Sequence, residues 1–297
     1  MEDAHTLEQA PTRDGLVVAG IYLVAMVVGV ASALLAPGHV VLQLLAGTSV
    51  ATVVVYLASF FTRNASMYDA YWSVAPGCMA IGLAVVGGGD PWRIALAAAL
   101  VALYALRLTG NWYRGWGGLD HVDWRYEQIE ARTGIFWQPV NFLGIHYMPT
   151  LMTWAGALPL VPVMLFPGAP LGWLDGLAAL VTLLGIALET IADEELRAHR
   201  RTRRDASELL RTGLWARCRH PNYLGEMLFW WGLGLFAVAS GPDRWVYLAG
   251  AAAITALFLG VSIRLIETRL GERKPDYARY QAEIPMLLPR LGTPPPA

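Results

Sequence analysis

Several polar residues lie inside apolar stretches of this chain, at spacings that place them on common helix faces. The clearest group is the segment Arg219–Glu226, RHPNYLGE, which opens an apolar run. Proline is favoured in the first turn of a helix, and the free N–H groups of that turn attract anions. Asn222 and Glu226 are then one turn apart on the same face. Because a carboxylate in an apolar helix is costly without a partner, we favour a ligand-binding over a structural role for Glu226.

A second group consists of Tyr104, Arg107, Asn111 and Arg114. On a helix their side chains fall within about 80° of one another. Snorkelling of the two arginines to the membrane surface is one explanation of this stripe. It leaves the shared face of Tyr104 and Asn111 unexplained, so we expect the stripe to face protein or a cavity rather than lipid.

A third group is Glu189, Asp193 and Arg200, which lie within about 40° on one helix face. Eight arginines follow between Arg197 and Arg219. These cations are suited to anionic lipid, and their guanidinium groups can also bind phosphates through paired hydrogen bonds. Both interpretations stay open for different arginines.

Two further places allow a structural or a functional interpretation. Asp69 follows Asn64 and Ser66 at the start of an apolar segment. It either supports the helix terminus there or acts as a proton donor or substrate-binding carboxylate. Arg264 and Glu267 are three residues apart, as in an intrahelical ion pair, or they belong to the ligand site. No zinc-type spacing of Cys or His occurs, and we expect no metal.

The elements that hold these groups must be membrane helices. Hydrophobic residues make up 56% of the 297 residues and charged residues only 15%, whereas soluble domains carry roughly 25% charge. This composition excludes a disordered chain or a small secreted domain, and the net charge of −1 predicts no nucleic-acid partner. We predict an all-α polytopic bundle of seven or eight spans. The eight candidates are residues 16–36, 39–61, 67–88, 92–113, 142–165, 170–192, 221–240 and 244–266.

The distribution of cations predicts the orientation of the bundle. With eight spans, 20 of the 22 cations fall on one side, and Arg93 and Arg244 remain on the other. Cytoplasmic loops carry the excess of Arg and Lys, so both termini should be cytoplasmic. We expect one membrane domain, with N-terminal helices in 15–62 and a core in 63–297. Long cytoplasmic segments at 114–141, 193–220 and 267–297 should admit a soluble ligand.

The segment RTGLWARCRHPNYLGEMLFWWGLGLF resembles the C-terminal signature of the steroid 5-alpha-reductase family, in particular its uncharacterised bacterial branch. The likeness extends to GIALETIADEELRAHR, to LYALRLTGNWYRGW and to the stretch 275–289, and covers roughly residues 64–290. The RHPxYxG core also occurs in isoprenylcysteine carboxyl methyltransferases. The resemblance implies a protein of the bacterial inner membrane that takes a hydrophobic substrate from the bilayer, among membrane lipids.

The resemblance also implies that the protein uses NADPH to reduce a C=C bond in a steroid-like or isoprenoid enone. Tyr104 would bind the substrate carbonyl, with Asp69 beside it where the family has a glutamate. One alternative is a methyltransferase that uses S-adenosylmethionine, and another is a non-catalytic lipid-binding membrane protein. The cofactor-binding residues implied are Arg107, Asn111, Arg114, Glu189, Asp193, Arg200, Arg219, His220, Asn222, Tyr223, Glu226, Arg264, Glu267 and Tyr277.

Overall fold

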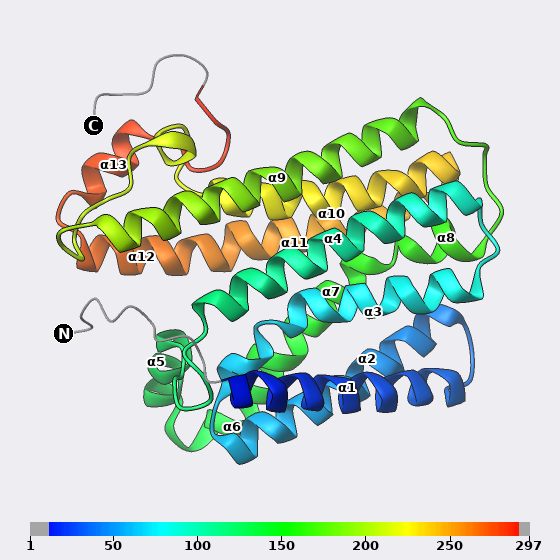
Figure 1. Cartoon of the computed structure of the whole chain (residues 1–297), viewed down its shortest axis with the longest axis horizontal. Coiled ribbons are helices and arrows are strands. Elements are labelled where there is room, and N and C mark those ends of the chain that lie inside the picture. The colour runs from blue at the N-terminus through cyan, green and yellow to red at the C-terminus, as the bar shows by residue number, and fades with distance from the viewer. Residues whose placement is uncertain (1–11, 291–297) are drawn as a thin grey trace.

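The chain folds as a bundle of long helices, as predicted from its composition (Figure 1). The computed structural model describes residues 12–290, and within that range no strand occurs. Seven helical stretches are long and apolar enough to cross a membrane, so the polytopic helical bundle is confirmed. They are α1 (Thr12–Leu35), α2 (Val40–Thr62), η1 with α3 (Ala65–Tyr68, Tyr71–Val86), α4 (Pro91–Gly115), α9 (Trp173–Thr202), α10 (Pro221–Ser240), and η5, α11, η6 and α12 together (Pro242–Tyr247, Leu248–Leu257, Phe258–Ser262, Ile263–Arg273).

The fifth of the eight predicted spans, 142–165, is not one continuous helix. It lies in a series of short elements: α6 (Trp137–Val140), the π-helix η3 (Asn141–Tyr147), α7 (Met148–Ala157) and α8 (Leu160–Leu165). Prolines interrupt this stretch, because proline has no backbone N–H for a helical hydrogen bond and its ring clashes with the preceding turn. The prolines are Pro139, Pro149, Pro159 and Pro162. The prediction of a regular span was wrong for this reason.

The interrupted segment nevertheless runs from one end of the bundle to the other. Near its start, Gln138 accepts a hydrogen bond from the Tyr56 hydroxyl of α2 at 3.1 Å. Near its end, the Met164 carbonyl accepts from Gly89 N in the α3–α4 turn at 3.0 Å. The described chain therefore makes eight passes, and α1 begins at the same end as α13 (Tyr277–Glu283) (Figure 1).

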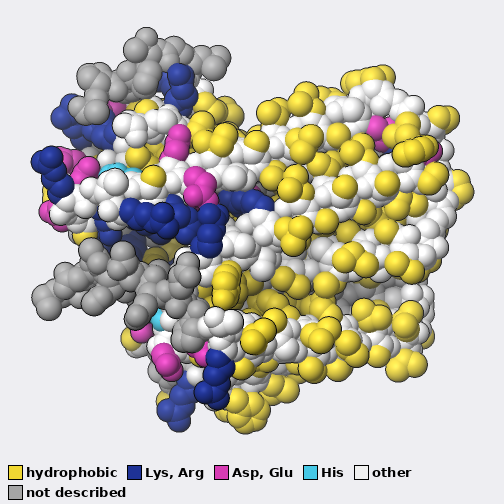
Figure 2. Space-filling view, in the orientation of Figure 1, with side chains coloured by type: hydrophobic (Ala, Val, Ile, Leu, Met, Phe, Trp, Pro, Cys, Tyr) yellow, Lys and Arg dark blue, Asp and Glu magenta, His cyan; other side chains and the backbone are white. Residues whose placement is uncertain are grey.

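Charge is concentrated at that end of the molecule. On the face shown in Figure 2, Lys and Arg side chains gather around α5 (Trp124–Thr133), α12 and α13, and hydrophobic side chains cover much of the rest. The two cations assigned to the opposite side make structural contacts there. Arg93 is buried and binds Asp175 at 2.6 Å, and Arg244 donates to the Pro162 and Pro167 carbonyls.

Helices α9 and α10 touch through their backbones. A Cβ on Gly185 would lie 2.6 Å from the Gly225 carbonyl oxygen, and one on Gly225 would lie 2.7 Å from the Gly185 oxygen. A Cβ on Gly232 would overlap the Thr182 hydroxyl oxygen. Small residues allow such close van der Waals packing between membrane helices. Since Glu189 and Glu226 each follow these glycines by a few residues, the contact brings their carboxylates together.

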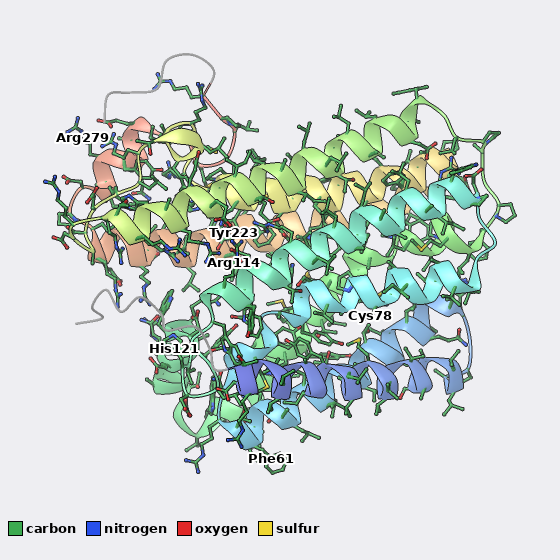
Figure 3. All side chains as sticks on the ribbon, in the orientation of Figure 1. Phe61, Cys78, Arg114, His121, Tyr223 and Arg279 are labelled. Atoms are coloured by element: carbon green, nitrogen blue, oxygen red, sulfur yellow. The ribbon has the colours of Figure 1, made fainter. Side chains whose placement is uncertain are left out.

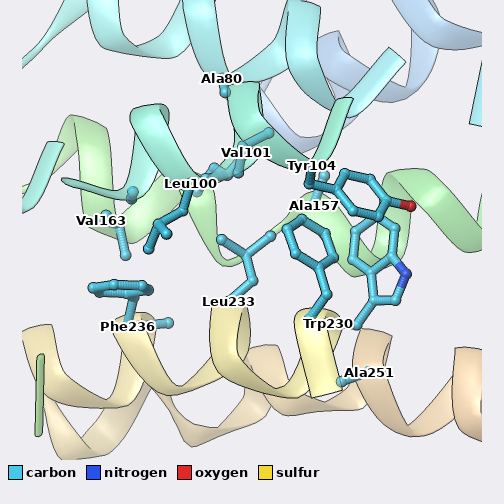
Figure 4. Close-up of a cluster of buried hydrophobic side chains, with 14 of the residues drawn as sticks. Ala80, Leu100, Val101, Tyr104, Ala157, Val163, Trp230, Leu233, Phe236 and Ala251 are labelled. Carbon is cyan, nitrogen blue, oxygen red and sulfur yellow. The ribbon is translucent and has the colours of Figure 1, made fainter. Parts of the chain in front are cut away.

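The largest buried cluster packs α10 against α3, α4, α7, α8 and α11. Tyr104 on α4 stacks on Phe229 of α10, with ring centroids 3.7 Å apart, and meets the Trp230 ring edge to face. Figure 4 shows the apolar side chains of Leu100, Leu233 and Phe236 on one side of these rings. The hydroxyl of Tyr104 and the ring nitrogen of Trp230 point away from that apolar cluster in the same view.

The α9–α10 contact predicts a position-specific effect of alanine. Gly185→Ala should destabilise the protein by about 1–3 kcal/mol, because its methyl group would meet the backbone of α10. The matched control on the same helix is Gly176→Ala, where no atom lies within 4 Å of the position that the methyl group would take and alanine favours the helix. Thermal unfolding in detergent should show a lower Tm for the first variant only. Equal Tm values would contradict the proposed contact.

Candidate functional site

The carboxylate of Glu226 is the centre of a buried polar site between α3, α4 and α10. Its Oε1 accepts hydrogen bonds from the Tyr104 hydroxyl at 2.6 Å, Trp72 Nε1 at 2.8 Å and Trp230 Nε1 at 2.9 Å. Glu226 is 4% exposed and Tyr104 is fully buried. Three donors on one oxygen offset part of the cost of burying the carboxylate, and the bond to Glu226 holds the Tyr104 hydroxyl in a single direction.

Three buried acceptors around this centre have no hydrogen-bond partner. They are the second oxygen of Glu226, one oxygen of Glu189 on α9, and the amide oxygen of Asn222. Glu189 and Glu226 also interact electrostatically. Acceptors of this kind cannot bond to each other without a donor, and buried polar groups in folded proteins almost always have partners. Arg107 Nη1, a buried donor beside Glu189, also lacks a hydrogen-bond partner, so this centre leaves both donors and acceptors for a ligand to satisfy.

The predicted polar stripe of α4 faces α9, as expected. Arg107 binds Glu189 at 2.6 Å and Asp193 at 2.5 Å, and Asn111 donates to Asp193 at 2.7 Å. Closer to the charged end, Arg114 pairs with Glu194 at 2.6 Å, and both side chains are about half exposed. Arg197 donates to the Asn111 amide oxygen. Paired charges thus lead from the buried Glu226 to the membrane surface.

Asp69 lies apart from this arrangement. Its carboxylate accepts from Arg125 at 3.0 Å and from the Tyr126 hydroxyl, both on α5. The expected contact between Asp69 and Tyr104 is absent from this geometry, because Asp69 points to α5 and Glu226 occupies the position beside Tyr104. Asn64 caps η1 by accepting a hydrogen bond from Ser66 N.

The C-terminal residues expected to bind cofactor form a compact cluster with one another. Glu267 on α12 pairs with Arg219 at 2.7 Å and with His220 at 3.0 Å, so its partners come from the start of α10 rather than from Arg264. Arg219 also donates to the Ile284 carbonyl at 2.5 Å. Tyr277 is buried, its hydroxyl has no partner, and burial raises its pKa. The cluster attaches α12 and α13 to the site.

The remaining expected residues lie near the charged end. Tyr223 stacks on Phe258 at 5.0 Å and on His220 at 5.6 Å. Arg200 is exposed and interacts electrostatically with Asp193, and Arg264 is exposed on α12. Figure 3 shows Arg114 and Tyr223 nearer the charged end than Cys78. Within residues 12–290 no group of three or more His, Cys, Asp or Glu could hold a metal ion.

Sequence reasoning did not include Trp72 and Trp230 among the site residues. Trp230 is four residues after Glu226, which places both on one helix face, and this spacing could have indicated the contact. Trp72 comes from a distant helix and carries no such local signal.

The buried His220 predicts a loss of stability in acid. Burial lowers its pKa below the usual value of about 6.5, against the opposing effect of Glu267. The unfolded chain therefore takes up this proton at a higher pH than the folded chain. The contribution of the neutral His220 to the stability of the folded protein is complete above about pH 6.5 and decreases as the pH falls. The Tm of the unmodified protein should decrease between pH 7 and pH 5, and the decrease should be smaller in His220→Gln. An equal decrease of Tm in both proteins would contradict this role of His220.

Comparison with known proteins identifies a relative in Schizosaccharomyces pombe and a matching family model. A chain of Schizosaccharomyces pombe, "Uncharacterized protein C594.04c", is 29% identical over 265 residues, which cover 80% of this chain and 76% of that protein. No solved structure matches significantly. The model of the family described as "Protein of unknown function (DUF1295)" matches residues 55–284, a range that holds every site residue described above. This chain therefore belongs to the DUF1295 family.

Proposed function

We propose that this protein is a membrane-embedded reductase that uses NADPH to reduce a C=C bond in a lipidic enone. The observation that carries the proposal is the set of three orphaned acceptors beside the Tyr104–Glu226 hydrogen bond. The steroid 5-alpha-reductase-like motifs support the same function. In the cell, the charged end would face the cytoplasm from the bacterial inner membrane.

The residues present fit the cofactor. A nicotinamide carboxamide offers N–H donors, which the free oxygens of Asn222 and Glu226 would accept. Its phosphates need cations, and Arg107, Arg114 and Arg200 extend from the buried centre toward the exposed end. When bound, NADPH would supply a hydride.

The protein residues would prepare the substrate for that hydride. Reduction of an enone places negative charge on the carbonyl oxygen, which needs a preorganised donor. In the structure the Tyr104 hydroxyl donates its one hydrogen to Glu226 and stacks on Phe229. It would become the donor to the carbonyl oxygen when Glu226 is protonated and donates to the tyrosine oxygen in turn. We propose Glu226, rather than Asp69, as the carboxylate that positions Tyr104. The burial of both groups excludes water from the reacting bond.

Cofactor titration with purified protein tests the proposal. NADPH should change the tryptophan fluorescence, since Trp72 and Trp230 contact Glu226. Glu226→Gln should weaken NADPH binding by roughly tenfold or more, because an amide NH2 would replace an orphaned acceptor. Glu272→Gln, an exposed change on α12, is the matched control. Binding of S-adenosylmethionine in place of NADPH would favour the methyltransferase, and binding of neither would favour a lipid-binding protein.

A second variant separates chemistry from binding. Tyr104→Phe should retain NADPH binding but reduce turnover of a steroid or prenyl enone by roughly 10²–10³-fold, since it removes the donor to the carbonyl oxygen. Tyr113→Phe, on the exposed face of the same helix, should keep full activity. Turnover is measured by the decrease in NADPH absorbance and by the mass of the product. Unchanged turnover in Tyr104→Phe would exclude the proposed role of this hydroxyl.

A further inference from the structure

The π-helix η3 holds two buried polar side chains that the proposed reductase site does not use. His146 has no exposed surface and Asn141 is 3% exposed. The π-helical stretch covers Asn141–Tyr147, and π-helical turns occur frequently at functional sites. Neither residue belongs to the motifs quoted above.

The hydrogen bonding of His146 determines what its free nitrogen can do. Nδ1 lies 3.1 Å from the backbone oxygen of Asn141, and a carbonyl can only accept, so Nδ1 carries the hydrogen. The ring contacts are with Tyr56 and Tyr68, and neither supplies a negative partner for a charged imidazole. The ring is therefore neutral, and Nε2 presents a lone pair.

Two unsatisfied acceptors result. His146 Nε2 and the Asn141 side-chain oxygen are both buried without a hydrogen-bond partner. A third buried atom without a partner, the Ser59 hydroxyl, lies one turn after Tyr56 on α2. A ligand for His146 and Asn141 must therefore donate, which excludes ketones, ethers and phosphate esters as the group recognised.

An apolar groove lies next to these residues. It has a volume of about 390 Å³ between α2 and the start of the interrupted segment, and is lined by Val53, Tyr56, Leu57, Gln138, Pro139 and Phe142. The Tyr56 ring lines the groove and meets the His146 ring edge to face, with ring centroids 5.5 Å apart. Its hydroxyl donates to Gln138 at 3.1 Å. The groove therefore adjoins the residue that contacts the buried imidazole.

We propose that this region binds a hydrophobic molecule from the bilayer that bears a neutral hydroxyl group. The hydrocarbon occupies the groove, and the hydroxyl donates to His146 Nε2. The apolar lining favours a hydrocarbon body over water alone. The site goes beyond the proposed reductase and does not require a cofactor.

The test compares an alcohol with its methyl ether, using the full chain in lipid nanodiscs without NADPH. Farnesol should bind about three- to tenfold more tightly than farnesyl methyl ether, because only the alcohol can donate. His146→Phe should remove this preference while keeping the ring, and His121→Phe, in an exposed loop, should keep it. Affinities are obtained by competition with a photoreactive farnesol, and the cross-linked peptide should include residues 137–150.

Equal affinities of the alcohol and the ether for the unmodified protein would overturn the proposal, since water would then satisfy the acceptors. A preserved preference in His146→Phe would also overturn it. If that variant does not fold, His146→Gln keeps an acceptor and should keep the preference. Because this experiment contains no NADPH, a negative result would not affect the reductase proposal. Absence of NADPH binding would likewise not affect the proposed alcohol site.

Discussion

The backbone contact between α9 and α10 is the constraint on which the site depends. Glycines at 185 and 225 allow the two helices to approach until a Cβ at either position would overlap the other backbone. At that separation, Glu189 and Glu226 interact directly. Two acidic side chains do not approach in an apolar bundle unless other groups compensate. Arg107 on one side, and the Tyr104 hydroxyl with two indole N–H groups on the other, provide that compensation.

The two ends of the bundle use charge differently. At the apolar end, Arg93 with Asp175 and Arg244 with backbone carbonyls join loops to helices, and these groups have their partners. Toward the charged end, ion pairs between α4 and α9 are followed by exposed arginines. Orphaned acceptors occur around Glu226 and around η3. These two places are where we propose ligands, while other unpaired buried atoms, such as the Tyr277 hydroxyl and Trp116 Nε1, lie outside them.

The interrupted segment between α6 and α8 connects these features. Prolines prevent it from forming a regular helix, and the π-helix places His146 and Asn141 inward. Tyr68, which contacts His146, is four residues before Trp72, which contacts Glu226. The proposed reductase site and the proposed alcohol site therefore flank the same short stretch of chain at the start of α3.

The sequence by itself determined the class of fold, a span count of seven or eight, the clustering of cations at one end and the face of α4 that turns toward protein, since these follow from composition and helical periodicity. It also identified Glu226 as a buried carboxylate in need of partners. Only the tertiary structure decided which partners it has. Asp69 and Glu226 are both acids near the start of helices, and helical periodicity does not determine which of them contacts Tyr104. That choice depends on contacts between helices far apart in the chain, as do the pairing of Glu267 with Arg219 and the orphaned state of His146.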